Sequence, residues 1–331
     1  MLDHAPTLHI GRWSTGRFHE LGGFGVDIFF AISGLLICSR LLDEEETTGG
    51  LQIKGFYVRR IFRIQPAALF YLGVVLLLTL FHRLPVYGVG LITSLFLVRN
   101  YFGMNNTTAP AVGWVTAHYW SLSVEEHFYL ILPSLLRFTR RWRAQILLGL
   151  AVAGFAWRMS LGNQVTSDFF SIRVRTEDCI CFLFLSAGAA VLLRREGFRQ
   201  LAVRYIRSFA VLPLAVIMLW FHRPLRSVVE IIPVFMVMST MLHPEELAAK
   251  LLEWAPLRFV GRISYSLYLW QQIFLSCSWA PTIRPFGWLN CSALVWPCSF
   301  AAAIGSYYLI EKPFIRLGHR FAPPTTSGRP I

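Results

Sequence analysis

Two adjacent carboxylates, Glu125 and Glu126, stand at the start of an apolar run that covers residues 128–136. An ionisable side chain at membrane depth costs a few kcal/mol or more, so it needs a partner or a chemical role. Adjacent residues of a helix point about 100° apart. One carboxylate could therefore face a polar interior while the other pairs with a basic group. The alternative is that both are hydrated at the membrane interface.

Two further residues could take part in proton transfer or in orienting a reactive group. His4, which follows Asp3, is a candidate general base because a neutral imidazole accepts a proton near neutral pH. A solvated histidine near a terminus is the alternative. Asp27 opens an apolar segment and needs a cation or a donor nearby. It could also be a helix-start acid that the helix dipole stabilises.

Three arginines could bind an anionic ligand. Arg59 and Arg63 are four residues apart and share one face of a helix, with Arg60 beside them. Guanidinium groups in this arrangement can grip the phosphates of a nucleotide-bearing donor. They can equally anchor the chain to lipid headgroups.

Aromatic and hydroxyl side chains supply candidates for substrate binding. Tyr265, Tyr268 and Trp270 could form an interfacial aromatic belt, or they could line a cavity for a sugar. Trp120 and Ser123 precede the paired glutamates and are further candidates. The six cysteines fit no zinc or haem spacing, and we predict no metal site.

The elements that carry these residues are predicted to be membrane helices. Of the 331 residues, 55% are hydrophobic and 15% are charged, whereas soluble domains carry about 25% charged residues. Several apolar runs approach the roughly 20 residues that cross a bilayer. We expect an all-α, polytopic integral membrane protein with about ten transmembrane helices. The runs cover residues 24–42, 64–81, 86–98, 128–136, 144–161, 179–193, 209–221, 228–242, 263–278 and 289–310.

The net charge of +13 lies mostly in short linkers between these runs. This pattern is typical of cytoplasmic loops and leaves no soluble basic domain for nucleic acid. The basic loops cannot all be cytoplasmic if every run is a span, so either 86–98 is not a full span or one basic loop is external. Residues 54–63 are expected to lie along the membrane surface. We predict one membrane domain over residues 1–322 and a disordered tail over 323–331.

The order of these motifs resembles the acyltransferase type 3 family of bacterial membrane O-acyltransferases. The resemblance covers essentially the whole chain. It rests on six segments in order, which are His4-Ala5, Gly25 to Gly34, Phe56 to Pro66, Trp120 to Pro133, Ser264 to Trp270 and Glu311 to Pro313.

The resemblance implies transfer of an acyl group, commonly acetyl from acetyl-CoA, to a hydroxyl of a cell-surface or exported carbohydrate or glycolipid. It implies a multi-pass protein of the bacterial inner membrane with acyl-CoA as donor substrate and no bound cofactor. His4 would be the catalytic base, while Arg59, Arg60 and Arg63 would serve the donor. Asp27 and the two glutamates would orient or tune groups in the cavity, which we expect to open towards the cytoplasm.

Three departures from the family pattern bear on activity. The family's first helix normally precedes the equivalent of His4 and is missing here, so we expect either a start further upstream or a truncated product. His127 replaces a glutamine, and Gln271 replaces a histidine that could transfer a proton. A non-catalytic or transporter-like protein, or an acyltransferase with a lipid or small-molecule acceptor, are the alternatives.

Overall fold

The structure is a computed structural model in which the described parts of the chain are almost wholly helical. Its described residues are 9–10, 13–14, 19–84, 86, 88–102, 110–160, 174–208, 211, 213, 231–275, 284–291 and 293–323. Beside the helices these ranges hold one short antiparallel pairing, between β1 (His9–Ile10) and β2 (Trp13–Ser14). His4, most of the run 209–221 and the predicted tail beyond residue 323 lie outside the described residues.

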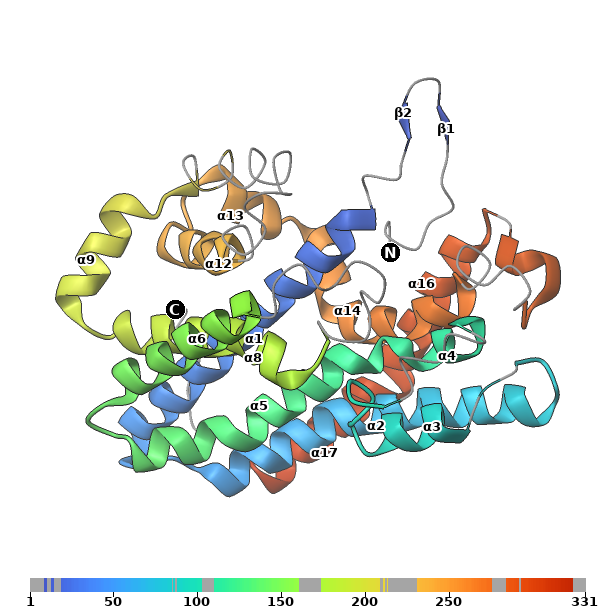
Figure 1. The fold of residues 1–331 in the computed structure, drawn as a ribbon, viewed down its shortest axis with the longest axis horizontal. Coiled ribbons are helices and arrows are strands. Elements are labelled where there is room, and N and C mark those ends of the chain that lie inside the picture. Colours follow the sequence, from blue (N-terminus) through green and yellow to red (C-terminus); the bar gives the residue numbers. More distant parts are fainter. Residues whose placement is uncertain are drawn as a thin grey trace. The chain divides into compact units, whose positions relative to one another are not determined.

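The described residues form two compact units, and Figure 1 shows their helices in chain order. Unit 1 comprises the described residues of Met1–Gly22, Ile53–Ser123 and Phe259–Pro324, and unit 2 those of Gly23–Gln52 and Val124–Arg258. Unit 1 holds α2 (Ile53–Leu80), α3 (Gly88–Leu95), α4 (Pro110–Ala117), η3 (Gly287–Cys291), α16 (Val295–Ser306), the π-helical turn η4 (Tyr307–Glu311) and α17 (Lys312–Phe321). Unit 2 holds α6 (Arg143–Ser160), α8 (Thr176–Leu192), α9 (Glu196–Tyr205), α12 (Ile232–Leu242) and α13 (Leu247–Leu252). Three helices cross the boundary along the chain, which are α1 (His19–Thr48), α5 (Tyr119–Phe138) and α14 (Ala255–Phe274).

Two of the described helices are long and apolar enough to cross a membrane. They cover Phe24–Thr48 and Ile53–Leu80, and the second is 28 residues long, more than the roughly 20 that a bilayer requires. A third span is possible if α8 and α9, which meet at 112°, are counted together. Several large apolar side chains of α2 point outward, among them Leu77 and Leu80. Such a surface suits lipid better than water.

In unit 1, α2 and α17 lie side by side although they are distant in sequence (Figure 1). The ring of Phe62 packs against Phe314 and Phe321, with centroids 6.5 and 5.7 Å apart. Gly318 permits this approach, because a Cβ there would stand 2.6 Å from the Cβ of Phe62. Helix α17 thus packs against the helix that carries the three candidate donor arginines.

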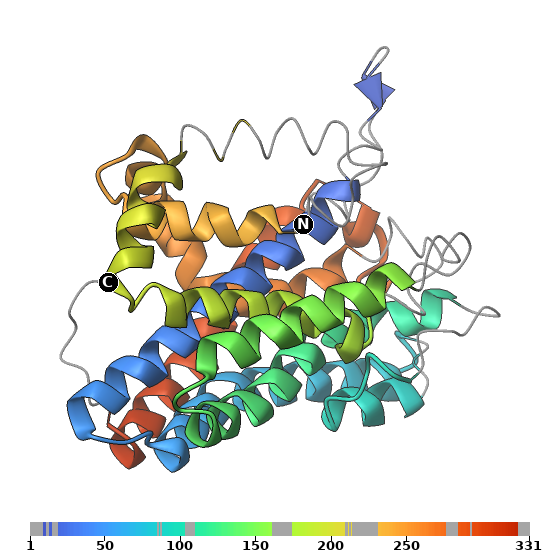
Figure 2. The ribbon, with the colours of Figure 1, turned by 60° about the vertical axis from the view of Figure 1, so that its left-hand side comes forward.

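In unit 2, glycines bring α8 close to its neighbours, and Figure 2 shows the green α6 and the yellow-green α8 along their shared length. A Cβ on Gly154 would lie 2.8 Å from Cys181, and one on Gly188 would lie 2.8 Å from Leu148. On α1, a Cβ on Gly34 would lie 2.5 Å from the carbonyl oxygen of Leu183. Small residues allow such close helix packing in membrane proteins.

Two sequence expectations can be compared directly with the helices. The run 86–98 forms only α3, which has eight residues and extends about 12 Å at 1.5 Å per residue. It is therefore too short to span a bilayer as a single helix. The stretch 54–63 is not a separate surface helix, because it continues without a break into the rest of α2. Pro66 lies inside this continuous helix.

Candidate functional site

A buried carboxylate is the centre of the candidate site in unit 2. Glu125 lies on α5 with 4% of its surface exposed. Its Oε1 accepts hydrogen bonds from the hydroxyl of Ser33 on α1 and from the hydroxyl of Tyr129, one turn further along α5. Ser33 and Tyr129 also hydrogen-bond to each other. A buried carboxylate is stable only with such donors, so this triad of side chains fixes both its position and its orientation.

The other candidate polar residues of α5 and α1 have different surroundings. Glu126 is half-buried on α5, and Asp27 is half-buried on α1, where its charge acts on the thiol of Cys179. His127 approaches Thr176, the first residue of α8, with 2.6 Å between Nδ1 and Oγ1. Of the paired glutamates, Glu125 is thus the one directed into the protein interior.

In unit 1, the candidate sugar-binding tyrosines make interhelical hydrogen bonds. The hydroxyl of Tyr268 on α14 donates to the carbonyl oxygen of His118 at 2.6 Å, and it lies 2.6 Å from the hydroxyl of Ser121 on α5. The hydroxyl of Tyr265 donates to the carbonyl oxygen of Ile64 on α2 at 2.9 Å. Both tyrosines therefore join α14 to other helices of this unit.

The other candidate substrate-binding residues are mostly buried. Ser123 is fully buried and donates to the carbonyl oxygen of Tyr119 within α5, while Trp120 is half-buried. Trp270 is 8% exposed and meets the ring of Tyr71 edge-on, with centroids 5.7 Å apart. Within the described residues, its indole N–H and the Oε1 of Gln271 have no hydrogen-bond partner. Buried polar atoms of this kind favour a nearby polar ligand or water.

The candidate donor arginines lie on the first half of α2, also in unit 1. Arg59 and Arg60 are half-buried, and Arg63 is exposed. The charge of Arg63 acts on Glu311, a buried carboxylate that accepts a 2.8 Å hydrogen bond from the hydroxyl of Ser266 on α14. Segments 56–66, 264–270 and 311–313 therefore meet in this unit.

His4 lies outside the described residues, so its predicted position near Arg59 and Arg63 stays a prediction. The same holds for a cavity that would join the arginines to Asp27, Glu125 and Glu126. The roles assigned to these residues rest on the sequence, and the structure adds which groups each described side chain contacts.

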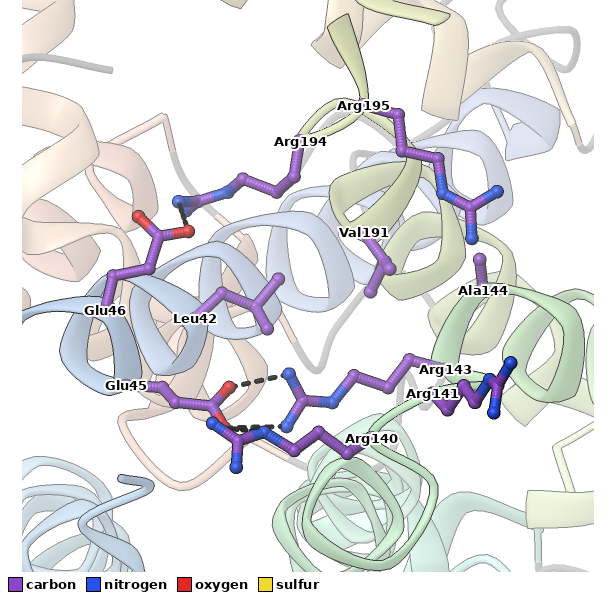
Figure 3. A pocket seen from close by; sticks show the side chains of 10 residues that line it. All are labelled: Leu42, Glu45, Glu46, Arg140, Arg141, Arg143, Ala144, Val191, Arg194 and Arg195. Carbon is purple, nitrogen blue, oxygen red and sulfur yellow. Dashed lines mark hydrogen bonds and ion pairs between the residues drawn. The ribbon is translucent and has the colours of Figure 1, made fainter. Parts of the chain in front are cut away.

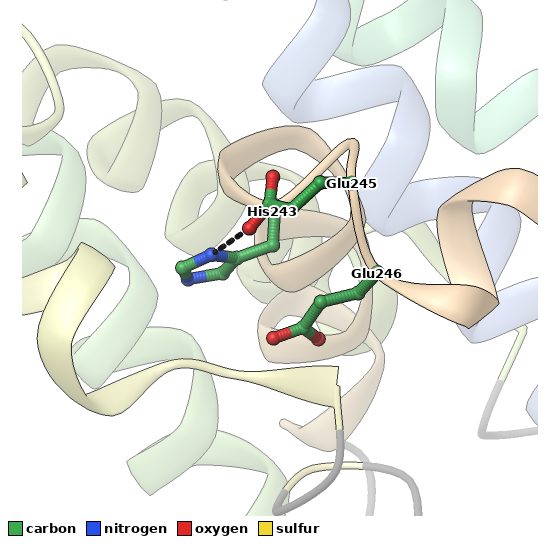
Figure 4. Close-up of side chains that lie close together, drawn as sticks. All are labelled: His243, Glu245 and Glu246. Carbon is green, nitrogen blue, oxygen red and sulfur yellow. Dashed lines mark hydrogen bonds and ion pairs between the residues drawn. The ribbon is translucent and has the colours of Figure 1, made fainter.

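One cluster of potential metal ligands occurs in the described residues, at the link between α12 and α13. His243, Glu245 and Glu246 have ligand atoms within 4.8 Å of one another (Figure 4). Glu246 already accepts hydrogen bonds of 2.8 Å from the Nε of Arg207 and from the backbone N–H of Ser208. These bonds lower the pKa of Glu246 to about 2. The hydrogen bonds of Glu246 connect the α12–α13 link to Arg207 and Ser208, which follow α9. This structural role explains the cluster better than a metal centre does.

Sequence reasoning did not select three of the hydrogen-bonding residues described above. Tyr129 had a usable signal, because it is four residues after Glu125 and therefore lies on the same helical face. For Ser33 and Ser266 the sequence offered no such signal, apart from their places in the family segments Gly25 to Gly34 and Ser264 to Trp270. Their partners, Glu125 and Glu311, are 92 and 45 residues away.

The fold and the site together define a class of protein. It is a helical protein that has apolar helices of membrane-spanning length and buried carboxylates held by hydrogen bonds. The sequence matches the acyltransferase domain family over residues 1–312, and the chain belongs to that family, acyltransferase type 3. This confirms the resemblance drawn from the six sequence segments.

Curated relatives share about 30% of the aligned residues. YrhL of Bacillus subtilis (strain 168) is 30% identical over 349 residues, covering 95% of this chain and 53% of the relative. The peptidoglycan O-acetyltransferase OatA of Listeria monocytogenes is 30% identical over 332 residues, covering 90% of this chain and 52% of the relative. The O-acetyltransferase OatA of Staphylococcus aureus (strain NCTC 8325) is 29% identical over 286 residues, covering 78% and 46%. The chain thus spans about half the length of these relatives, and no solved structure matches it.

Proposed function

We propose that this protein transfers an acetyl group from an acyl-CoA donor to a hydroxyl of a cell-surface carbohydrate. Family membership supports acyl transfer. The names of the relatives in Listeria monocytogenes and Staphylococcus aureus contain O-acetyltransferase, and the former specifies peptidoglycan. Peptidoglycan is therefore the acceptor that we propose to test first.

The observation that carries this proposal is the buried Glu125, which two family segments hold in place. Ser33 belongs to the segment Gly25 to Gly34, and Tyr129 belongs to Trp120 to Pro133. A chain that had only inherited the scaffold would have no need for an ionisable group at this depth, where it costs several kcal/mol unless it is used.

The proposed reaction divides the work between the candidate residues. His4 takes the proton from the acceptor hydroxyl as its oxygen attacks the thioester carbonyl, and the C–S bond then breaks to release CoA. Arg59, Arg60 and Arg63 bind the phosphates of the donor. Asp27, Glu125 and Glu126 orient polar groups around the reacting atoms.

The proposed setting is the bacterial inner membrane, with about ten transmembrane helices and one membrane domain over residues 1–322. The two apolar helices of spanning length and the outward apolar surface of α2 support a membrane location. The basic linkers support a cytoplasmic side for the donor, because cytoplasmic loops carry an excess of arginine and lysine.

The test is acetate released by mild base from purified peptidoglycan of a bacterium that lacks its own O-acetyltransferase and expresses this chain. We expect acetate above the empty-vector level with the wild-type protein. His4→Ala should reduce the acetate released by about 100-fold or more, the lower end of general acid–base contributions. Glu125→Gln, which changes an orienting group and not the base, should reduce it by at least about tenfold. Glu253→Gln is the matched control, since Glu253 is an exposed carboxylate of the same unit.

Expression of every variant is checked by immunoblot of the membrane fraction. Full acetylation by both Glu125→Gln and His4→Ala would contradict the assigned roles. A wild-type protein that reaches the membrane but releases no acetate from peptidoglycan would contradict the proposed acceptor.

A further inference from the structure

A basic pocket lies in unit 2, separate from the arginines of α2, where the last turns of α1 and α8 meet the link between α5 and α6 (Figure 3). Its volume is about 440 Å³, within the range of small-molecule sites. We define the basic pocket by its lining residues, which are Leu42, Glu45, Glu46, Arg140, Arg141, Arg143, Ala144, Val191, Arg194 and Arg195.

The two acids that line the basic pocket are already engaged by arginines. Glu45 forms two hydrogen bonds with Arg143, at 2.6 and 3.0 Å, and an ion pair with Arg140 at 3.5 Å. Glu46 pairs with Arg194 at 2.9 Å. Both glutamates and three of the five arginines, Arg140, Arg143 and Arg194, are thus paired with one another. These pairs hold the side chains that form the wall of the pocket in position.

Two positive charges of the basic pocket remain without an acidic partner. The side chains of Arg141 and Arg195 are exposed, and neither guanidinium group makes a hydrogen bond or an ion pair within the part of the chain that the structure describes. They come from different turns, one after α5 and one after α8. Five arginines against two glutamates leave the lining with a net charge of +3, which an anion would reduce.

The surroundings of the basic pocket distinguish between possible anions. Guanidinium groups from several elements suit a phosphate, because they can donate in planar pairs to its oxygens. Leu42, Ala144 and Val191 add an apolar wall that a free phosphate would not use. Two aromatic side chains next to the pocket arginines, Phe138 and Trp142, are 82% and 57% exposed. Exposed aromatic residues beside basic ones are typical of a membrane–water interface.

We propose that the basic pocket binds the phosphate of an anionic glycerophospholipid, with Arg141 and Arg195 as its ligands and the apolar wall against its glycerol and upper acyl chains. Basic pockets between helices on the cytoplasmic side of membrane proteins suit such headgroups. The inference does not depend on the proposed function. The lipid would hold together α1, the α5–α6 link and α8, and it would be neither donor nor acceptor.

The test uses the full chain purified in a neutral detergent, with bound lipid measured by native mass spectrometry. Phosphatidylglycerol, phosphatidylcholine with the same acyl chains, and inorganic phosphate are titrated separately. We expect phosphatidylglycerol to bind at least tenfold more tightly than phosphatidylcholine. The double variant Arg141→Gln/Arg195→Gln should weaken phosphatidylglycerol binding by about fivefold per arginine, or ~25-fold in total.

The matched control is Arg137→Gln/Arg199→Gln. Arg137 and Arg199 are exposed, lie four residues from Arg141 and Arg195, and do not line the pocket. This double variant removes the same charge and should keep the wild-type affinity. Equal losses in both double variants would mean non-specific attraction and overturn the proposal. Inorganic phosphate that binds as tightly as phosphatidylglycerol would assign the pocket to a free anion and overturn it too.

Discussion

Two arginines that share one carboxylate should differ sharply in their contribution to stability. Arg143 and Glu45 are almost buried, with side chains 10% and 12% exposed, whereas Arg140 is 74% exposed. Arg143 also donates from Nε to the carbonyl oxygen of Leu136 at 2.8 Å. Replacing Arg143 by alanine removes three hydrogen bonds and leaves Glu45 nearly buried with only the exposed arginine. We expect a loss of about 3 kcal/mol, since breaking a buried pair costs about 3–5 kcal/mol.

Arg140→Ala is the internal comparison, because it removes an arginine from the same carboxylate. An exposed pair contributes about 0–1 kcal/mol, so the expected loss is below about 0.5 kcal/mol. Each arginine is combined with Glu45→Gln in a double-mutant cycle. The coupling energy should be about 2 kcal/mol for Arg143 and near zero for Arg140, within the usual span for contacting residues of about 0.5–3 kcal/mol.

The assay is equilibrium unfolding in mixed micelles, in which a denaturing detergent is titrated and tryptophan fluorescence is followed. Only variants that unfold reversibly enter the cycle. If Arg143→Ala and Arg140→Ala destabilised the protein equally, the burial of the pair could not be the reason for its strength, and the reasoning would fail.

Two further predictions concern helix packing and a pH-dependent contact. Gly318→Ala should destabilise the protein by about 1–3 kcal/mol in the same assay, because the new Cβ would overlap Phe62. The control is Gly149→Ala, which lies in open space on α6 and should be neutral or slightly stabilising. Equal effects of the two substitutions would contradict the packing argument. The hydrogen bond from Arg207 lowers the pKa of Glu246 from its ordinary value of about 4.5 to about 2. The stabilisation from this bond is therefore complete above about pH 4.5 and disappears as the pH falls through 2. Glu246→Gln should raise amide hydrogen exchange around residues 205–208 at pH 7, and protection that stayed unchanged would show that the carboxylate is dispensable.

The long apolar helices could be predicted because their signal is local. The run 24–42 lies within α1 and the run 64–81 overlaps α2, since uninterrupted apolar sequence needs no tertiary partner to be recognised. Helix ends were less predictable. Lys54 to Arg63 looked like a separate amphipathic element because its charged residues break the apolar run, yet the helix continues through them.

The candidate site was predictable only where partners are close in sequence. Tyr129 follows from its spacing to Glu125, but the bond from Ser33 depends on how α1 packs against α5. The basic linkers were visible as runs of arginine. The sequence did not show which of these arginines pair with acids. Arg143 and Arg194 form ion pairs with Glu45 and Glu46, whereas the side chains of Arg141 and Arg195 do not. The difference depends on where the folded chain directs each side chain.

The glycines around α8 have a consequence for motion. Where a Cβ cannot fit, one helix can neither rotate nor slide past the other without a collision, because a shift of one residue would turn a side chain into the gap. Gly34, Gly154 and Gly188 place three such contacts along α8, facing α1 and α6. These contacts oppose rotation and sliding between the three helices, so we expect α1, α6 and α8 to keep their packing when other parts of the chain move.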